Sequence, residues 1–285
     1  FDGLPTPKVY DTGVDPDSWA RIPAGEFLFG QFDYDTMVDY DYEIMVTPVT
    51  NAQYANYLNE ALAAGSIQIN ADNEVIGPYP GDKFHGEKHE IEILPGDYLH
   101  VPLNNAEDTG LRLVYDGNTF TVAAGYENHP MTVVTWYGAR AYCEFYGVRL
   151  PTEIEWEKAA RGTEGIPYPW GDELLRNHAN YYFSEDPFEK DAGKVGMTNP
   201  VGFYNGKTYD GYQTLDSASP YGVYGMAGNV WEWTGNVYEG TDNRYMRGGS
   251  KAETERRLRV WSRDNARPAH YSPNVGFRAV RSVND

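Results

Sequence analysis

Glycine, proline and aromatic residues recur along the whole chain so densely that little room is left for long regular elements. The 285 residues include 30 glycines, 18 prolines, 24 tyrosines, 11 phenylalanines and 7 tryptophans. Glycine and proline interrupt helices and strands, whereas aromatic side chains gain free energy when they are buried. Disordered chains lack such aromatic residues. The sequence therefore predicts a loop-rich globular protein.

Helix-start signals mark three segments, each preceded by a threonine that can act as N-cap. Two of these threonines stand three residues before Gln53 or Glu155, which is the spacing of a capping box. The predicted helices run over 51–64 after Thr50, over 136–146 after Thr135, and after Thr152 to the glycine at 162. Beyond that glycine the chain has few periodic runs. The pattern indicates an α+β fold with much irregular structure.

No internal repeat and no linker of shifted composition divides the chain, so a single domain is expected. Residues 1–21 are predicted to form an extended N-terminal arm, because prolines break any periodicity there. The domain proper covers 22–285 and carries an insertion at about 65–128. Within the insertion, Asp116-Gly117-Asn118 separates two alternating runs and predicts a β-hairpin.

Composition also limits the partners. The net charge of −19 repels phosphate backbones, so nucleic acid is not an expected partner. The sequence has no apolar run long enough to span a membrane. Its one cysteine, Cys143, allows no intrachain disulfide. The chain starts at Phe1 without a methionine, which suggests either a removed signal peptide, and hence a periplasmic or extracellular location, or a start chosen for expression.

Charge is distributed unevenly. The stretch from Thr241 to Asp285 has 10 basic and 5 acidic residues, so it carries +5 while the remaining 240 residues carry −24. Two interpretations are open. The arginines can pair with the acidic body of the same domain, or they can line a groove that attracts anions.

Seven segments occur in the order known from one protein family. They are IPAGEFLFG (22–30), VTPVTNAQYANYLN (46–59), HPMTVVTWYGARAYCEFYGVRLPTEIEWEKAARG (129–162), YPWGDE (168–173), YGVYGMAGNVWEWTGN (221–236), YMRGGS (245–250) and NVGFRAVR (274–281). In these segments the chain resembles the formylglycine-generating enzyme family, also called the sulfatase-modifying-factor domain. The resemblance implies an irregular variant of the C-type-lectin fold.

The resemblance also implies calcium. In the family, the turn that matches GNVWEW holds a calcium ion through backbone carbonyls and the glutamate, which suits a hard cation. Where many relatives carry Asn or Asp, this chain has Gly225, so one side-chain oxygen is missing. Carried over by position, the implied ligands are Gly228, Val230 and Glu232 for this site and Asn180, Tyr181 and Asp191 for a second family site.

The chain departs from the family just after GGS. Members that make formylglycine carry two cysteines five residues apart in this segment, and the thiolate pair binds copper. Counted from Ser250, the two positions fall on Glu253 and near Leu258; counted back from GFR, the second falls nearer Glu255. Cys143 lies mid-helix and is expected to be a buried small hydrophobe. We therefore expect no copper and no formylglycine-generating activity.

Histidines offer a separate metal candidate inside the insertion. His85 and His89 have a spacing that could place both on one helix face, with Glu87, Glu90 and His100 nearby. Gly86 weakens such a helix, and surface histidines among glutamates need no metal. His129 precedes a proline in a family-like turn and is expected to be structural.

Three functions remain. The first is a binding protein whose partner is a protein, a peptide or a small anionic or aromatic ligand. The second is a cysteine-independent tailoring enzyme, like relatives that oxidise a siderophore chromophore, with Glu253 or Glu255 as acid–base. The third is an accessory subunit of a larger extracytoplasmic complex. The predicted groove comprises Trp231, Ser250, Arg256, Arg257, Arg259, Trp261, His270 and Tyr271.

Overall fold

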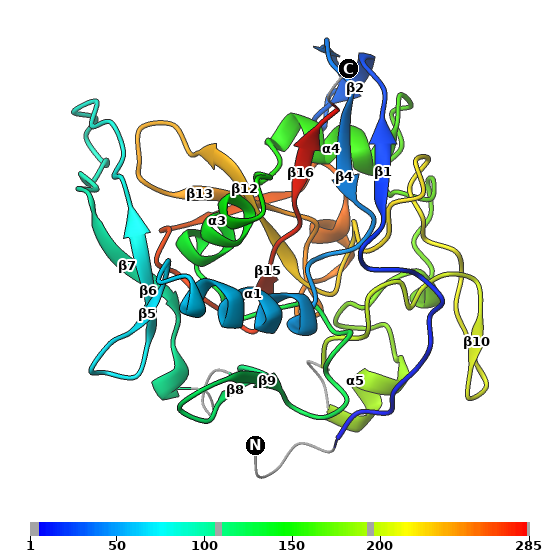
Figure 1. Ribbon diagram of the computed structural model, residues 1–285. Coiled ribbons are helices and arrows are strands. Elements are labelled where there is room, and N and C mark those ends of the chain that lie inside the picture. The colour runs from blue at the N-terminus through cyan, green and yellow to red at the C-terminus, as the bar shows by residue number, and fades with distance from the viewer. Residues whose placement is uncertain (1–5, 106–109, 193–196, 284–285) are drawn as a thin grey trace.

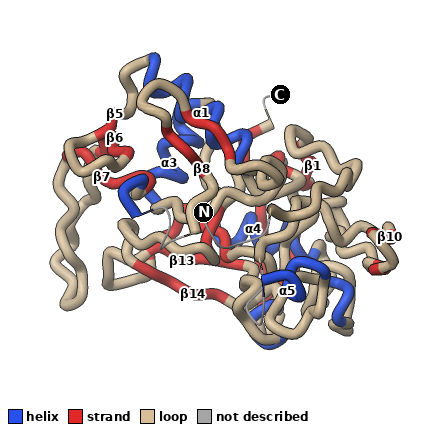
Figure 2. The backbone as a smooth tube through the Cα atoms, turned by 90° about the horizontal axis from the view of Figure 1, so that it is seen from below, coloured by secondary structure: helices blue, strands red, loops and turns tan. Residues whose placement is uncertain are grey.

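The computed structural model describes residues 6–105, 110–192 and 197–283 (Figure 1). Its helices are α1 (Asn51–Ala63), α3 (Trp136–Phe145), α4 (Glu153–Arg161) and α5 (Pro187–Ala192), with short 3₁₀ helices η1 (Leu103–Asn105), η2 (Arg176–His178) and η3 (Glu255–Leu258). One sheet of three strands consists of β1 (Trp19–Ile22), β4 (Tyr42–Met45) and β16 (Val280–Ser282), and a second of β5 (Gln68–Ile69), β6 (Val75–Tyr79) and β7 (Gly96–Val101). A sheet of four strands consists of β14 (Arg263–Ala266), β13 (Arg244–Arg247), β12 (Trp231–Val237) and β15 (Val275–Gly276). The remaining strands form pairs, which are β2 (Gly25–Phe29) with β3 (Tyr34–Val38), β8 (Leu113–Tyr115) with β9 (Phe120–Val122), and β10 (Thr208–Tyr209) with β11 (Tyr212–Gln213). Loops make up most of the chain (Figure 2).

The three predicted helices are confirmed, and local capping explains where they begin. At α1, the Thr50 side chain accepts a hydrogen bond from the backbone N–H of Gln53, whose Oε1 accepts from the N–H of Thr50 at 2.9 Å. The same reciprocal pair joins Thr152 and Glu155 at α4. Each cap satisfies backbone donors that the first helical turn leaves unpaired.

The sheet of β1, β4 and β16 joins distant parts of the sequence. Strand β4 lies in the middle and pairs antiparallel with β1 on one side and β16 on the other (Figure 1). Strand β1 begins at Trp19, so residues 19–21 belong to this sheet, although the sequence placed them in the N-terminal arm. Apolar side chains at Ala20 and Ile22 point into the core, which is why these residues pair instead of staying extended.

The sheet β14-β13-β12-β15 carries the motif segments. Strand β12 holds the WEW tripeptide, pairs antiparallel with β13, and pairs in parallel with β15 through Trp231↔Val275 and Glu232↔Gly276. Helices α3 and α4 contact β12, and α4 also contacts β13. The turns that follow β13 and precede β15 therefore meet at one end of this sheet.

The insertion packs onto the core. Its predicted hairpin is confirmed as β8 and β9, which pair from Leu113↔Val122 to Tyr115↔Phe120. The side chain of Asn59 in α1 bonds both backbone groups of Phe120, at 2.9 and 2.7 Å. The largest apolar cluster unites insertion residues with helix and motif residues; among its members are Val75, Val101, Phe120, Tyr54, Trp233 and Phe277.

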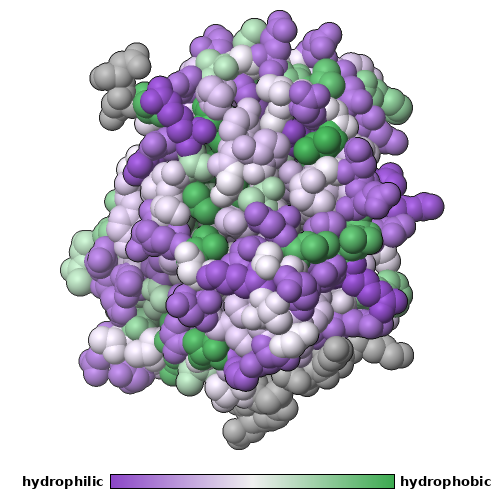
Figure 3. Space-filling model, turned by 90° about the vertical axis from the view of Figure 1, so that its right-hand side faces the viewer, coloured by the Kyte–Doolittle hydropathy of each residue, from purple (hydrophilic) through white to green (hydrophobic). Residues whose placement is uncertain are grey.

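The N-terminal segment crosses the side of the molecule that carries β10. Tyr10 packs against Phe188, Phe203 and Tyr209, with ring centroids 5.3–5.8 Å apart. Lys207 and Asn205 donate hydrogen bonds to the carbonyl of Thr12. The face of the molecule on that side is mainly hydrophilic, with separate small apolar spots (Figure 3). Among the described helices, none is both long and apolar enough to cross a bilayer.

Candidate binding site at the C-terminal segment

Two motif turns lie against each other at the start of the candidate site. After β13 the chain turns at Gly249, whose φ of +73° and whose distance of 2.7 Å from a built Cβ to the Arg257 carbonyl oxygen both require glycine. Gly228 donates to the carbonyl of Gly248 at 2.8 Å, and Lys251 donates to that of Asn229 at 3.0 Å. These bonds fix Ser250 and the residues after it beside GNVWEW.

Trp231, Glu253 and Arg257 form one cluster. Trp231 Nε1 donates to Glu253 Oε1 at 3.2 Å, and Arg257 Nε lies 3.7 Å from Glu253 Oε2. The guanidinium of Arg257 also lies 5.0 Å from the centre of the Trp231 ring and pairs with Asp264. All of these charged side chains are partly exposed. The position that matches a family cysteine therefore holds a carboxylate whose oxygens face an indole N–H and a guanidinium.

Other predicted groove residues lie apart from this cluster. Trp261 contacts two guanidinium groups, that of Arg161 at 5.3 Å and that of Arg259 at 5.8 Å from its ring centre. Glu255 and Arg256 are exposed on η3. The structure thus brings Trp231, Glu253 and Arg257 together and places Arg259 and Trp261 in a second cluster.

The remaining groove candidates face the core or its edge. Ser250 is 1% exposed and its hydroxyl accepts from the N–H of Ala252 at 3.3 Å. Tyr271 packs on the largest apolar cluster, and the exposed His270 lies 6.4 Å from the Trp233 ring centre. Four cavities lined by described residues have volumes of about 20, 390, 410 and 510 Å³, and none of the predicted groove residues lines any of the four.

Glu232 does not fit the calcium site that the resemblance implies. Its Oε2 accepts hydrogen bonds from Arg278 Nε at 2.7 Å and Trp156 Nε1 at 2.8 Å, and its Oε1 accepts from Arg278 at 2.7 Å. Glu232 and Arg278 are both fully buried. A guanidinium already neutralises the carboxylate and would repel a cation at the same place.

The second implied calcium set fits in part. Asn180 is 1% exposed, and its Oδ1 has no hydrogen-bond partner among the described residues. An unpaired buried amide oxygen is a ligand type that calcium accepts. Tyr181 is also buried, and Asp191 lies in α5, but its side chain falls outside the described part of the structure.

Cysteine and histidine positions are explained by packing. Cys143 is fully buried, and this burial raises the pKa of its thiol well above the usual range, so a reactive thiolate is disfavoured.

The segment around His85 is a loop, because Gly86 has a φ of +80°, so the helix face that would join His85 and His89 does not form. The described residues include no group of three or more metal-binding side chains. His129 is buried, with Nδ1 hydrogen-bonded to Thr198 Oγ1 at 2.9 Å.

Lys251, which follows the GGS motif directly, was not among the predicted site residues. Its Nζ donates to the carbonyl of Pro273 and to Asn274 Oδ1, which ties the site to the segment before β15. Burial lowers the pKa of this amine to about 7. The sequence held one signal for this role, a lysine directly after a motif whose residues are expected to be buried. A lysine in such a place needs a hydrogen-bonding partner, because lysine is almost never fully buried without one.

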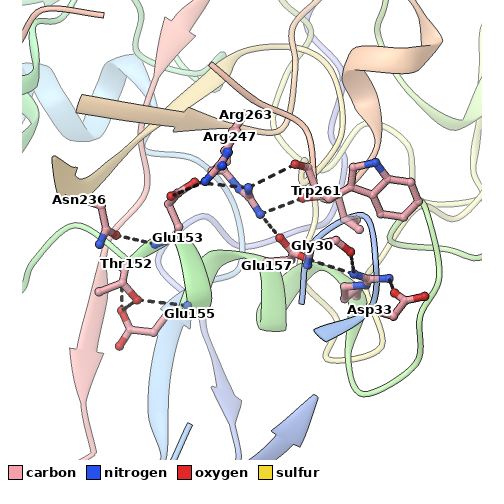
Figure 4. A network of polar contacts seen from close by, with 12 residues as sticks. Gly30, Asp33, Thr152, Glu153, Glu155, Glu157, Asn236, Arg247, Trp261 and Arg263 are labelled. Atoms are coloured by element: carbon pink, nitrogen blue, oxygen red, sulfur yellow. Dashed lines mark hydrogen bonds and ion pairs between the residues drawn. The ribbon is translucent and has the colours of Figure 1, made fainter. Parts of the chain in front are cut away.

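A buried ion-pair network supports the site from α4 (Figure 4). Arg247 contacts Glu153 and Glu157, and its NH2 donates to the carbonyl of Val260 at 3.0 Å. Glu157 also pairs with Arg161 at 3.0 Å. Arginines of the basic stretch thus pair with carboxylates elsewhere in the chain; the pairs are Arg244–Asp82, Arg247–Glu157, Arg263–Glu153, Arg278–Glu232 and Arg281–Glu43.

Comparison with known proteins agrees with this architecture. The family model for the sulfatase-modifying factor enzyme 1-like domain matches residues 9–283. A protein of Bos taurus named inactive C-alpha-formylglycine-generating enzyme 2 is 38% identical over 161 residues, 53% of this chain and 50% of that protein. The serine/threonine-protein kinase pkn1 of Chlamydia pneumoniae is 28% identical over 92% of this chain and 38% of its own length. The chain thus spans half or less of these two curated relatives.

Solved structures share the fold. PvdO from Pseudomonas aeruginosa superposes with a TM-score of 0.59 at 20% identity, over 93% of this chain and 94% of that one. The observed mixture of a few short helices, short strands and long loops confirms the predicted α+β, irregular C-type-lectin-like fold.

Proposed function

This chain belongs to the sulfatase-modifying factor enzyme 1-like family, and on that premise we propose that it is a binding protein or accessory subunit that does not generate formylglycine. Its partner is a protein, a peptide or a small anionic or aromatic ligand held at the C-terminal segment. We further propose that it acts outside the cytoplasm, in the periplasm or extracellular space, without copper and with calcium only at the Asn180 side.

One observation carries this proposal. Glu253, where the resemblance expects the first copper-binding cysteine, is bonded to Trp231 and faces Arg257. Copper(I) prefers soft thiolate ligands, and a carboxylate paired with a guanidinium offers neither a sulfur nor a free charge. The one cysteine of the sequence, Cys143, is fully buried. A relative that is named an inactive formylglycine-generating enzyme supports the proposal that a chain of this family can lack the activity.

The enzymatic alternative finds less support. A cysteine-independent tailoring enzyme, as in siderophore maturation, would use Glu253 or Glu255 to move a proton. Glu253 is engaged by two neighbours, and Glu255 is exposed on η3, where its backbone carbonyl accepts a hydrogen bond from the Tyr168 hydroxyl at 3.5 Å. The carboxylate oxygens of Glu253, held by an indole N–H and a guanidinium, are poorly placed to take a proton from a substrate.

A direct assay tests the absence of formylglycine chemistry. The protein is incubated with Cu(I), oxygen and a peptide that carries a sulfatase cysteine motif, beside an active family member as positive control. We expect no aldehyde on the peptide cysteine and no stoichiometric copper. Aldehyde formation, or a copper site that survives Cys143→Ser, would refute the proposal.

A second experiment tests binding. Native mass spectrometry of protein purified from its source organism should show a co-purifying chain or ligand. The complex should be lost in an Arg257→Glu variant, because this substitution reverses the charge beside Trp231, and kept in Arg281→Glu, which makes the same charge change on β16. A bound small molecule that is chemically altered over time would favour the enzyme instead.

A further inference from the structure

The largest of the four cavities is built partly by the insertion and lies away from the C-terminal cluster. Its volume is about 510 Å³, within the range of small-molecule sites. Tyr79 of β6 forms one wall, Trp136 and Arg140 of α3 another, and Arg149 and Arg244 approach from the segment before α4 and from β13. These walls come from one half of the molecule, the left half in Figure 1, where β6, α3, β12 and β13 lie.

The walls alternate guanidinium groups with aromatic rings. The Arg140 guanidinium lies 4.7 Å from the centre of the Tyr79 ring, and that of Arg244 lies 4.3 Å from the centre of the Trp136 ring. Stacking of this kind uses the face of the guanidinium and leaves its N–H groups, which lie in the plane, available to an acceptor.

Arg244 has a donor that the protein leaves unused. Its side chain is 1% exposed; NH1 donates to the carbonyl of Asp242 at 2.7 Å and NH2 pairs with Asp82. Its Nε is buried and has no hydrogen-bond partner among the described residues. A buried charged donor without an acceptor is costly, so a ligand oxygen at this place would gain a strong, charge-assisted hydrogen bond.

Donor geometry, not net charge, favours an anion at this cavity. Three arginines line it, and each has one carboxylate partner: Arg140 pairs with Glu144, Arg149 with Glu155 and Arg244 with Asp82. Within the described part of the chain, Arg140 forms an ion pair with Glu144, and its side chain remains 24% exposed. Short-range donors decide recognition here, because long-range repulsion by the net charge of −19 is screened beyond about 8 Å at physiological ionic strength.

We propose that this cavity binds a small carboxylate that carries an aromatic group, with the carboxylate at the guanidinium groups of Arg140 and Arg244 and the ring against Tyr79 and Trp136. The site is independent of the binding function proposed above, since none of the C-terminal groove residues lines it.

Three probes that share a phenethyl group but differ in charge test the proposal on the intact protein. N-acetyl-L-phenylalanine supplies a carboxylate, N-acetyl-L-phenylalaninamide is its neutral counterpart, and phenethylamine is a cation. Titrations followed by ligand-observed NMR should show the carboxylate bound at least about tenfold more tightly than either other probe. Equal binding of the amide, tighter binding of the amine, or no binding of the carboxylate at millimolar concentration would overturn the proposal.

Matched variants locate the site. Arg140→Gln should weaken binding of N-acetyl-L-phenylalanine at least about tenfold. Glu144→Gln should leave the affinity unchanged or raise it, because it frees the Arg140 guanidinium. Arg281→Gln removes the same charge beside a different cavity and should have no effect. Unchanged binding in Arg140→Gln, or an equal loss in Arg281→Gln, would refute this placement. If Arg140→Gln fails to fold, the comparison of the three probes on the wild-type protein still decides.

Discussion

At the scale of single residues, the pairing of Glu232 with Arg278 decides what the GNVWEW turn can hold. The two side chains form a doubly hydrogen-bonded, fully buried ion pair. The carboxylate is thereby a structural counter-ion for an arginine 46 positions away. A family resemblance that assigns residues position by position cannot reveal such a partner.

We predict that Glu232→Gln destabilises the fold by about 3–5 kcal/mol, because Arg278 would keep an unpaired buried charge. Replacing both partners, as in Glu232→Gln with Arg278→Met, should restore part of that loss. Denaturant unfolding measures both variants. The loss should be the same with added calcium and with chelator; a calcium-dependent stabilisation that disappears in Glu232→Gln would show that Glu232 binds the metal after all.

Lys251 should make stability depend on pH. Its pKa falls from 10.5 in the unfolded chain to about 7 in the fold, so between these values the unfolded state binds more protons. Stability therefore rises with pH through this window, by at most about 1.4 kcal/mol per pH unit for one proton. Below about pH 7 both states are protonated and the burial penalty is constant.

The control for this effect is Lys251→Met, whose side chain is unbranched and one atom shorter and cannot titrate. The difference in unfolding free energy between wild type and variant should grow in favour of the wild type from about pH 7 to about pH 9. Parallel pH profiles of the two proteins would contradict the assignment.

At the scale of elements, α4 is fixed by a carboxylate on its buried face. Glu157 contacts both Arg161 and Arg247, and all three side chains are at most 1% exposed. Glu157→Gln should cost about 3–5 kcal/mol, since two buried guanidinium groups each lose one of their two carboxylate partners, Arg247 keeping Glu153 and Arg161 keeping Asp33. On α3, Glu144→Gln removes an exposed partner of Arg140 and should cost less than about 1 kcal/mol. Equal losses in urea unfolding would contradict this ranking.

The sequence predicted elements well where the determinants are local. The caps at Thr50 and Thr152 involve residues three positions apart, and the turn at Asp116-Gly117-Asn118 is equally local. The candidate site depends instead on which distant side chains meet. Trp231 and Glu253 do meet, but Trp261 turns to Arg161, a hundred positions earlier in the chain, and no local pattern encodes that choice.

At the scale of the whole molecule, the insertion and the motif segments share one apolar core. We therefore propose that residues 22–285 fold as a single domain in which the insertion is an integral part. Phe120→Ala in β9 removes a side chain that is 3% exposed and should cost about 3–5 kcal/mol.

Calorimetry tests this unity. The wild type should unfold in a single transition, and Phe120→Ala should lower the midpoint of that transition as a whole. A separate early transition, shifted alone by Phe120→Ala while the rest of the molecule stays at its original midpoint, would show that the insertion is an independent unit.

The guanidinium–carboxylate pairs of the core also constrain how such a sequence can evolve. Substituting one member of Glu232–Arg278 leaves the other as a buried charge without its counter-ion, so these two positions can change only together or through an uncharged pair. Arg256, which is exposed on η3, is under no such constraint. Related proteins that diverge from this sequence would therefore keep the buried ion pair or change both of its members together. Substitutions at exposed positions can meanwhile accumulate and create new binding specificities without a cost to folding.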